Sequence, residues 1–299
     1  MDIFGSISLA ALLTQILNGL TLGMILILIA TGLTLIFGMM EVVNFAHGAF
    51  YMLGAYFGLT LAQTTSSFWG FWVALLVAPV LVGATSLLVE QIGIKPLRGR
   101  DPLYHLLLTF GIALILRKVV EIFWGPDIHS LTTPELLRGP IQFFGVYYPK
   151  YRLFVLLFSA AVVALVGWFL QRTKYGIIIR AGTHDAEMVD ALGINISRIF
   201  TGVFVFGSVL AAIAGVVVGP LGSVQPGMGM DVIINAFIVV IIGGLGSFKG
   251  AVIGGLVLGL AQVLGVLFIP SFADAAIYIA VVLVLLFKPT GLLGEAELK

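Results

Sequence analysis

Residues 9–38, LAALLTQILNGLTLGMILILIATGLTLIFG, carry no charged side chain and decide the fold class of this chain. A helix of about 20 apolar residues crosses the ~30 Å hydrocarbon layer of a bilayer. This stretch is longer than one crossing requires, so the helix is expected to be tilted or to carry an interfacial turn before Leu12. Glu41, expected at the membrane interface, is the next charged residue, and residues 42–89 are again uncharged. The pattern predicts a chain that crosses a membrane repeatedly as helices.

The composition of the whole chain supports this prediction. Hydrophobic residues make up 60% of the 299 residues and charged residues only 10%, whereas soluble domains have about 25% charged residues. The apolar segments do not show the residue-by-residue alternation of membrane β-barrel strands. The sequence therefore predicts an all-α polytopic membrane protein with a single transmembrane domain over residues 1–299.

Charged and polar loops divide the chain into nine candidate spans, which predicts about eight to nine transmembrane helices. The spans lie near residues 9–38, 43–62, 69–90, 103–124, 153–171, 199–220, 232–248, 251–269 and 274–287. No Lys or Arg precedes Lys95, so the first span lacks the positive region of a secretory signal and is expected to be retained. The spacings Gly250/Gly254 and Gly255/Gly259 allow helix backbones to approach closely.

Lys and Arg are concentrated in two loops that are separated by two spans. Residues 91–102 contain three of them and residues 172–198 contain four. Because cytoplasmic loops are enriched in these residues, both loops are predicted to be cytoplasmic, together with Lys249, Lys288 and the C-terminus. The N-terminus and the loop 125–151 are then predicted to be external.

The segment 172–198, RTKYGIIIRAGTHDAEMVDALGINISR, is the most polar part of the chain, with seven charged side chains. We expect a short helix in it that begins near Thr183 and ends at Gly193. Such a helix would place Ala186 and Val189 on one apolar face. Two interpretations are open, a solvated connection between spans or a docking element for a cytoplasmic partner.

A carboxamide and an imidazole, Asn44 and His47, interrupt the apolar pattern near the start of the second span. Polar groups inside a membrane are costly and usually face a bundle interior or a water-filled cavity. On a helix these two residues would share a face with Tyr51, and Gly48 and Gly54 would leave room for a helix break. They either hydrogen-bond neighbouring helices or line a path through the bundle, and the sequence leaves both interpretations open.

Two glycine-rich stretches are typical of turns. Residues 243–250, GGLGSFKG, are too rich in glycine for an undisturbed helix, because each Gly costs up to ~1 kcal/mol relative to Ala. We predict a tight cytoplasmic turn there, near an inner gate, with Gly243, Gly244 and Gly246 as its flexible positions. Residues 219–231 are predicted to form an irregular external loop.

The sequence carries no motif typical of an enzyme. The phosphate-binding pattern G-x-x-x-x-G-K-[ST] is absent, as are H-E-x-x-H and G-x-S-x-G. The absence of cysteine excludes disulfides and Cys-ligated metals, and no basic cluster with interleaved aromatic residues suggests nucleic acid. An ion-coupled transporter should carry carboxylates within its spans, whereas Asp231 and Asp274 lie at span edges. Such a transporter, an intramembrane enzyme and a passive channel therefore remain alternatives with less support.

Four stretches occur together in a familiar order and spacing. They are VVNFAHGAFYMLGAY (42–56), TKYGIIIRAGTHDAEMVDALGIN (173–195), IIGGLGSFKGAVIGG (241–255) and LLFKPTGLLG (285–294). Together they resemble the LivH-type permease subunits of branched-chain amino acid ABC importers, and the resemblance covers residues 12–294. Related permeases import urea, short amides or aromatic acids, so these substrates are alternatives.

The resemblance implies a type II ABC importer-like permease of the bacterial inner membrane, with its N-terminus outside, no ATPase site and no bound cofactor or metal. The implied partners are a second homologous permease, two ATPases that use ATP, a periplasmic binding protein and membrane lipid, without nucleic acid. The residues that would line the path or gate are Asn44, His47, Gly48 and Tyr51.

The loop at 172–198 would couple this chain to the ATPase. Glu187 lies six residues before Gly193, which resembles the docking motif of ABC permeases, although Met188 and Val189 replace its usual small residues. The residues that would form the coupling loop are Arg180, Asp185, Ala186, Glu187, Asp190, Gly193 and Asn195.

Overall fold

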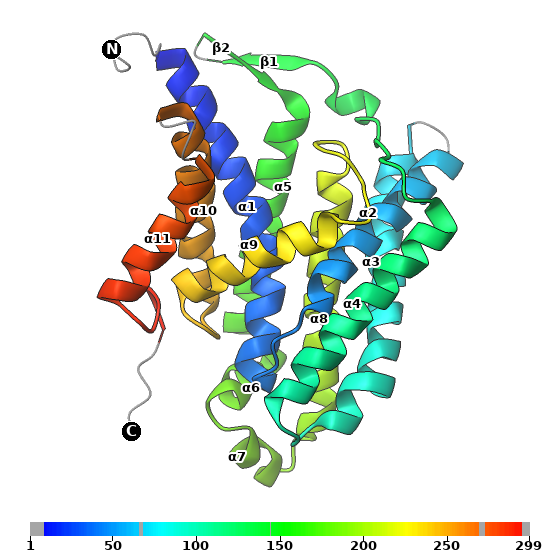
Figure 1. The fold of residues 1–299 in the computed structure, drawn as a ribbon, viewed down its shortest axis with the longest axis vertical. Coiled ribbons are helices and arrows are strands. Elements are labelled where there is room, and N and C mark those ends of the chain that lie inside the picture. Colours follow the sequence, from blue (N-terminus) through cyan, green and yellow to red (C-terminus); the bar gives the residue numbers. More distant parts are fainter. Residues whose placement is uncertain (1–8, 66–67, 144, 269–272, 295–299) are drawn as a thin grey trace.

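The computed structural model describes residues 9–65, 68–143, 145–268 and 273–294, and most of these residues are helical (Figure 1). The α-helices of this part are α1 (Leu9–Met40), α2 (Ala46–Thr64), α3 (Gly70–Val89), α4 (Pro102–Trp124), α5 (Lys150–Arg172), α6 (Lys174–His184), α7 (Ala186–Ala191), α8 (Ile196–Val218), α9 (Met228–Gly243), α10 (Phe248–Phe268) and α11 (Ala273–Phe287). Three shorter turns are η2 (Glu90–Ile94), η3 (Lys95–Leu97) and η4 (Glu135–Leu137). The predicted positions of the two chain ends concern residues 1–8 and 295–299, which lie outside the described residues.

Each of the nine predicted spans corresponds to a helix in this part of the chain, because each apolar run can satisfy its backbone hydrogen bonds only internally in a membrane. Five helices are long and apolar enough to cross a membrane: α1, α3 with its extension to Leu97, α5, α8 and α10. The predicted interfacial turn before Leu12 is wrong, since α1 is helical from Leu9. No Gly or Pro interrupts α1 before Gly19.

The prediction of an all-α chain is wrong in one place. Within the loop 125–151, strands β1 (Pro140–Phe143) and β2 (Val146–Pro149) form an antiparallel hairpin. Aromatic and β-branched residues such as Tyr147, Tyr148 and Val146 favour extended backbone. The hairpin lies at one end of the bundle, beside the start of α1 (Figure 1).

The loops gather at two opposite ends of the molecule, here called the hairpin end and the α7 end (Figure 1). At the hairpin end, the backbone N–H of His129 donates to the carbonyl oxygen of Val224 over 2.9 Å, which joins the two predicted external loops. The irregular part of the second loop is shorter than predicted. It ends at Gly227, since α9 begins at Met228 and places Asp231 in its first turn.

The two cation-rich loops meet at the α7 end. The side chain of Arg98 donates to the Oγ of Ser197 over 2.6 Å. The turn between α9 and α10 also lies here, because Gly246 approaches Gly38 near the end of α1. The prediction that the two cation-rich loops lie on one side of the molecule is therefore confirmed.

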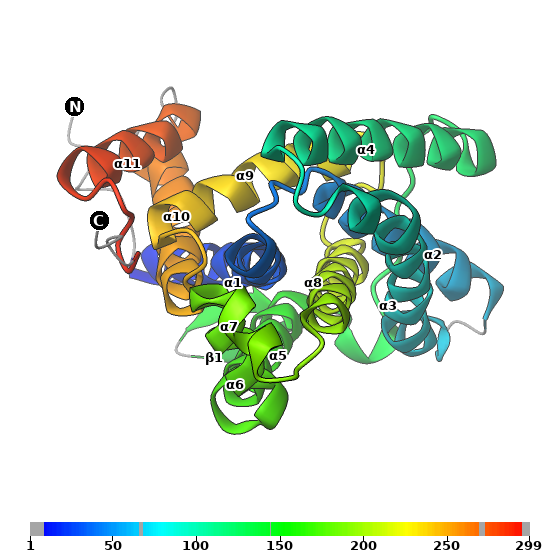
Figure 2. The same cartoon turned by 90° about the horizontal axis from the view of Figure 1, so that it is seen from below.

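Helix α1 lies at the centre of the bundle, between α10 and α8 (Figure 2). Its residues 25–36 are all buried. Against α10, the backbones approach so closely that a Cβ added at Gly23 would lie 2.9 Å from the carbonyl oxygen of Gly255. The predicted small-residue spacing Gly255/Gly259 thus serves the packing of α10 on α1.

Candidate functional site

The chain turns back into the bundle after α1. Glu41 follows the helix in a left-handed conformation, with φ of 54°, and is exposed, while residues 42–45 are not helical. His47, in the first turn of α2, places its Nε2 atom 3.0 Å from the carbonyl oxygen of Ile29. Ile29 lies about 16 Å from the end of α1 along the helix axis, at roughly 1.5 Å per residue. Helix α2 therefore begins deep inside the molecule.

The structure places the break before α2 and not within it. The helix is continuous from Ala46 to Thr64, so the predicted break at Gly48 or Gly54 is wrong. Asn44 lies in the non-helical segment, where its carbonyl oxygen accepts a hydrogen bond from the backbone N–H of His47. It therefore does not share a helical face with His47, as the spacing had suggested.

The glycines of α2 are explained by packing. A Cβ at Gly48 would collide with the carbonyl oxygen of Gly229 in α9, and one at Gly54 would collide with the backbone of Ala212 in α8. Tyr51 is buried on the same helix. The glycines let α2 sit between α8 and α9, which holds the Asn44–His47 segment against α1.

The side chains of Asn44 and His47 are fully buried, and most of their polar atoms are unpaired. Within the described residues, neither Oδ1 nor Nδ2 of Asn44 has a hydrogen-bond partner, and neither does Nδ1 of His47. Thr31 and Thr34, on the adjoining stretch of α1, also have buried hydroxyls without a partner there. A buried unpaired polar group costs about 1–3 kcal/mol. The neighbouring side chains of Asn44 and His47 therefore suit a region that accepts water or a polar solute.

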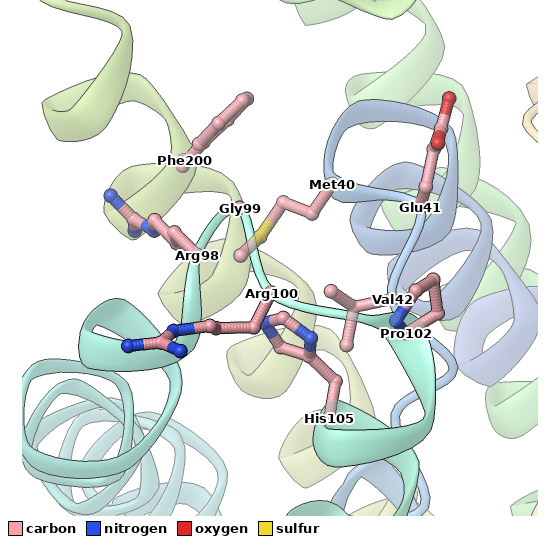
Figure 3. A pocket seen from close by; sticks show the side chains of 9 residues that line it. All are labelled: Met40, Glu41, Val42, Arg98, Gly99, Arg100, Pro102, His105 and Phe200. Carbon is pink, nitrogen blue, oxygen red and sulfur yellow. The ribbon is translucent and has the colours of Figure 1, made fainter.

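A cavity of about 220 Å³ opens at the α7 end, close to the non-helical segment (Figure 3). Met40, Val42 and Phe200 contribute apolar walls, whereas Arg98 and Arg100 contribute guanidinium groups. The remaining lining residues are Glu41, Gly99, Pro102 and His105. Figure 3 shows the Glu41 side chain extending away from both arginines. Because Arg98 is paired with Glu90, the apolar walls and the guanidinium of Arg100 are what can accommodate a small solute with an aliphatic part and a carboxylate.

The polar loop at the α7 end forms two helices, α6 and α7, instead of one. The predicted helix start near Thr183 is wrong, since Thr183 lies inside α6, which is capped by the side chain of Thr173. Asp185 caps α7, because its carboxylate accepts a hydrogen bond from the backbone N–H of Met188 over 2.8 Å. Gly193 ends this helix, as predicted, and its positive φ of 82° is a conformation that glycine adopts readily.

The face of α7 that was predicted to dock is only partly accessible. Val189 is buried against the rest of the chain, so it cannot seat in a groove of a partner. Ala186 is half-buried. The large apolar side chains that α7 and its C-terminal turn expose are Met188, 58% exposed, and Leu192, 73% exposed.

The polar residues of this loop divide into two groups. Asp185, Asp190 and Asn195 serve local structure: Asp190 accepts from the N–H of Ile196, and Asn195 caps α8. Arg180 and Glu187 are exposed and make no ion pair within the described part of the chain. These last two charges are therefore available to a partner.

The predicted turn between α9 and α10 is confirmed. Gly243 ends α9, and Gly244 and Gly246 take positive φ values of 108° and 77°. The C-terminal segment covers it, since the N–H of Leu292 donates to the carbonyl oxygen of Ile242 over 2.8 Å.

Sequence reasoning missed three charged residues within a predicted span. In α4, Glu121 pairs with Arg117 at 3.2 Å and with Lys118 at 3.0 Å. Arg117 also lines a small recess beside Phe45 and Gly229, at the starts of α2 and α9. The signal was present, because three charges within five residues are unusual in a membrane span.

The family described as branched-chain amino acid transport system / permease component matches residues 15–287. This chain belongs to that family. It is 34% identical to the high-affinity branched-chain amino acid transport system permease protein BraD of Pseudomonas aeruginosa, over 96% of this chain and 97% of that protein. It is 32% identical to the corresponding protein LivH of Escherichia coli, with the same coverage.

A second permease of Escherichia coli is also similar. Its high-affinity branched-chain amino acid transport system permease protein LivM is 27% identical, over 91% of this chain and 68% of that protein. Members of the family are permease components, and the present chain is accordingly a helical, multi-pass membrane permease.

Proposed function

We propose that this chain is the membrane-spanning permease subunit of an ABC importer and forms part of the path for branched-chain amino acids. The family supports this substrate over urea, short amides or aromatic acids. So do relatives that match nearly the whole chain, because their names specify branched-chain amino acid transport. The chain itself carries no transport ATPase motif, so the energy comes from partner subunits.

The observation that carries the path is the buried Asn44–His47 segment. At about 16 Å from the end of α1, it lies near the middle of a ~30 Å hydrocarbon layer. The unpaired carboxamide of Asn44 and the unpaired Nδ1 of His47 can hydrogen-bond the ammonium and carboxylate of a passing zwitterion without holding it tightly. The cavity at the α7 end, with its apolar walls and Arg100, is the exit of this path.

The orientation and partners follow from the distribution of charge. The α7 end carries the cation-rich loops and is cytoplasmic, while the hairpin end is external and receives substrate from a periplasmic binding protein. One of the two ATPases docks on α7 of this chain through Met188, Leu192 and the free charges of Arg180 and Glu187, and the other docks on the second permease. The second permease is homologous, as the similarity to both LivH and LivM suggests. The complex lies in the bacterial inner membrane.

Reconstitution tests this function. The chain is assembled with its second permease, ATPases and binding protein in lipid vesicles, and uptake of labelled leucine, isoleucine and valine is measured. Uptake should need ATP on the side of the membrane where the ATPases lie and the binding protein on the opposite side. Uptake driven by a proton or sodium gradient without ATP would contradict the proposal and favour a secondary transporter. Uptake of urea or aromatic acids instead of these amino acids would correct the substrate alone.

A further inference from the structure

A fully buried carboxylate lies at the α7 end, outside the path described above. Glu90 begins the π-helical turn that extends α3, and none of its side chain is exposed. It forms an ion pair with Arg98, the residue that follows η3. Its other carboxylate oxygen accepts a hydrogen bond from the hydroxyl of Thr201 in α8 over 3.0 Å.

Arg98 extends the network to the first turn of α8. Its Nη1 atom donates to both the hydroxyl and the carbonyl oxygen of Ser197, over 2.6 and 3.2 Å. Its guanidinium also lies over the ring of Phe200, 5.2 Å from the ring centre. Burial lowers the pKa of Arg98, and the Glu90 carboxylate offsets part of this effect.

The part of α8 that is held in this way follows directly on α7. The carboxylate of Asp190, in α7, accepts a hydrogen bond from the backbone N–H of Ile196, the first residue of α8. Ser197 is the next residue. A displacement of α7 therefore moves Ile196 and, with it, the adjacent Ser197, which accepts the hydrogen bonds of Arg98.

We propose that Glu90 and Arg98 are positioning residues that clamp residues 95–100 and the end of α3 to the first turns of α8. The clamp makes residues 95–100 move together with α7, although residues 95–100 need not touch the ATPase. Because Arg98, Arg100 and Phe200 line the exit cavity, the clamp transmits ATPase closure to the cavity walls. The inference rests on the proposed function, since it assigns the residues through which coupling in that importer passes.

The buried Glu90–Arg98 pair constrains its surroundings more than an exposed ion pair does. Burying a carboxylate is costly, and a buried pair often contributes little net stability compared with neutral residues of the same shape. Exposed pairs such as Arg138 with Glu135 contribute about 0–1 kcal/mol and constrain little. The buried pair links three segments, the end of α3, residues 95–100 and the first turns of α8, and so fixes these segments relative to one another.

The test uses the complete importer in vesicles. The double variant Glu90→Gln/Arg98→Gln removes both charges without leaving one buried alone, so it should assemble. We expect it to retain basal ATP hydrolysis but to transport about fivefold less amino acid per ATP, or lower still. The matched control Glu135→Gln/Arg138→Gln, at an exposed pair, should keep the wild-type ratio. Restoring charge with Glu90→Asp/Arg98→Lys should recover part of it.

A second measurement separates coupling from simple stability. Spin labels at Lys95→Cys and Arg198→Cys report the distance across the clamp, in a chain that has no native cysteine. The distance should stay constant with and without ATP in the charged protein and should spread on ATP binding in the double variant. A nucleotide-dependent distance in the charged protein, or a wild-type transport ratio in the double variant, would overturn the clamp. If the unaltered importer itself shows no ATP-dependent uptake, the proposed function fails instead.

Discussion

Helix α1 makes two glycine-lined contacts that differ in polarity. In the contact between α1 and α10, here called the α10 seam, Gly23 meets the backbone of Gly255 among apolar residues. In the contact of α1 with α2 and α8, here called the polar seam, Gly32 meets the backbone of Gly207 and the imidazole of His47. Both contacts depend on small residues, but the polar seam also holds Asn44 and His47, whose buried atoms Oδ1, Nδ2 and Nδ1 lack a hydrogen-bond partner among the described residues. Close packing alone therefore marks scaffold, whereas close packing with unpaired polar atoms marks the path.

The largest effect is expected in the α10 seam. Gly23→Leu places a side chain where even a Cβ would lie 2.9 Å from a backbone oxygen, so the helices must separate. We expect a loss of about 3 kcal/mol or more, because backbone contacts cannot relax as side chains do. The yield and thermal stability of the purified complex measure this loss.

Gly111→Leu, in α4, is the matched control, since a Cβ there has no neighbour within 4 Å. It should assemble normally. Equal assembly of the two variants would show that the α10 seam is not close-packed and would remove one side of the comparison.

In the polar seam, His47→Ala should reduce amino acid uptake about tenfold or more while the complex still assembles. The reason is that the imidazole supplies a hydrogen-bonding group deep within the bundle. His47→Gln keeps an N–H that can donate to Ile29 and should retain more uptake than the alanine variant. Uptake and complex yield are measured together. Should uptake remain normal, or should the complex fail to assemble in both variants, His47 would belong to the scaffold.

The sequence predicted much of this molecule because membranes impose simple rules. Apolar runs gave the helices to within a few residues, and loop cations placed two loops at one end. The re-entry of residues 41–45 could not be predicted, since helical spacing alone suggested that Asn44 continues α2. The Glu90–Arg98 pair was also out of reach, because Arg98 finds Glu90 and Ser197 only after α3 and α8 have packed. By contrast, Arg117, Lys118 and Glu121 were visible and were overlooked.

Changes at α7 should leave both seams intact and affect only coupling. Gly193 has a positive φ, and a β-branched residue there is strained by about 1–3 kcal/mol. Gly193→Val is therefore expected to lower transport per ATP severalfold, without altering complex yield. Gly202→Val, a glycine with no close neighbour on α8, is the control. A wild-type ratio for Gly193→Val would argue against α7 as the docking element, as would crosslinks to the ATPase from residues 91–102 but not from α7.

The smallest effects are expected at two buried threonines of α1, where stability and transport can be separated on one helix. Thr34 has a buried hydroxyl without a partner among the described residues, whereas the buried hydroxyl of Thr21 donates to the carbonyl oxygen of Leu17 and lies 3.1 Å from the hydroxyl of Tyr148. Valine has the shape of threonine without the hydroxyl. Thr34→Val should thus stabilise the complex by about 1 kcal/mol, since it removes an unpaired polar group, while Thr21→Val should destabilise it by a similar amount.

Transport should change in the opposite sense. Thr34→Val removes a buried hydroxyl that can bind water inside the bundle, so uptake should fall about twofold although the complex is more stable. Thr21→Val should leave uptake per assembled complex unchanged. Thermal unfolding and initial uptake rates, normalised to the amount of complex, measure both quantities. If Thr34→Val destabilises the complex, its hydroxyl has a partner in the assembled importer, and Thr34 belongs to the scaffold, as Thr21 does.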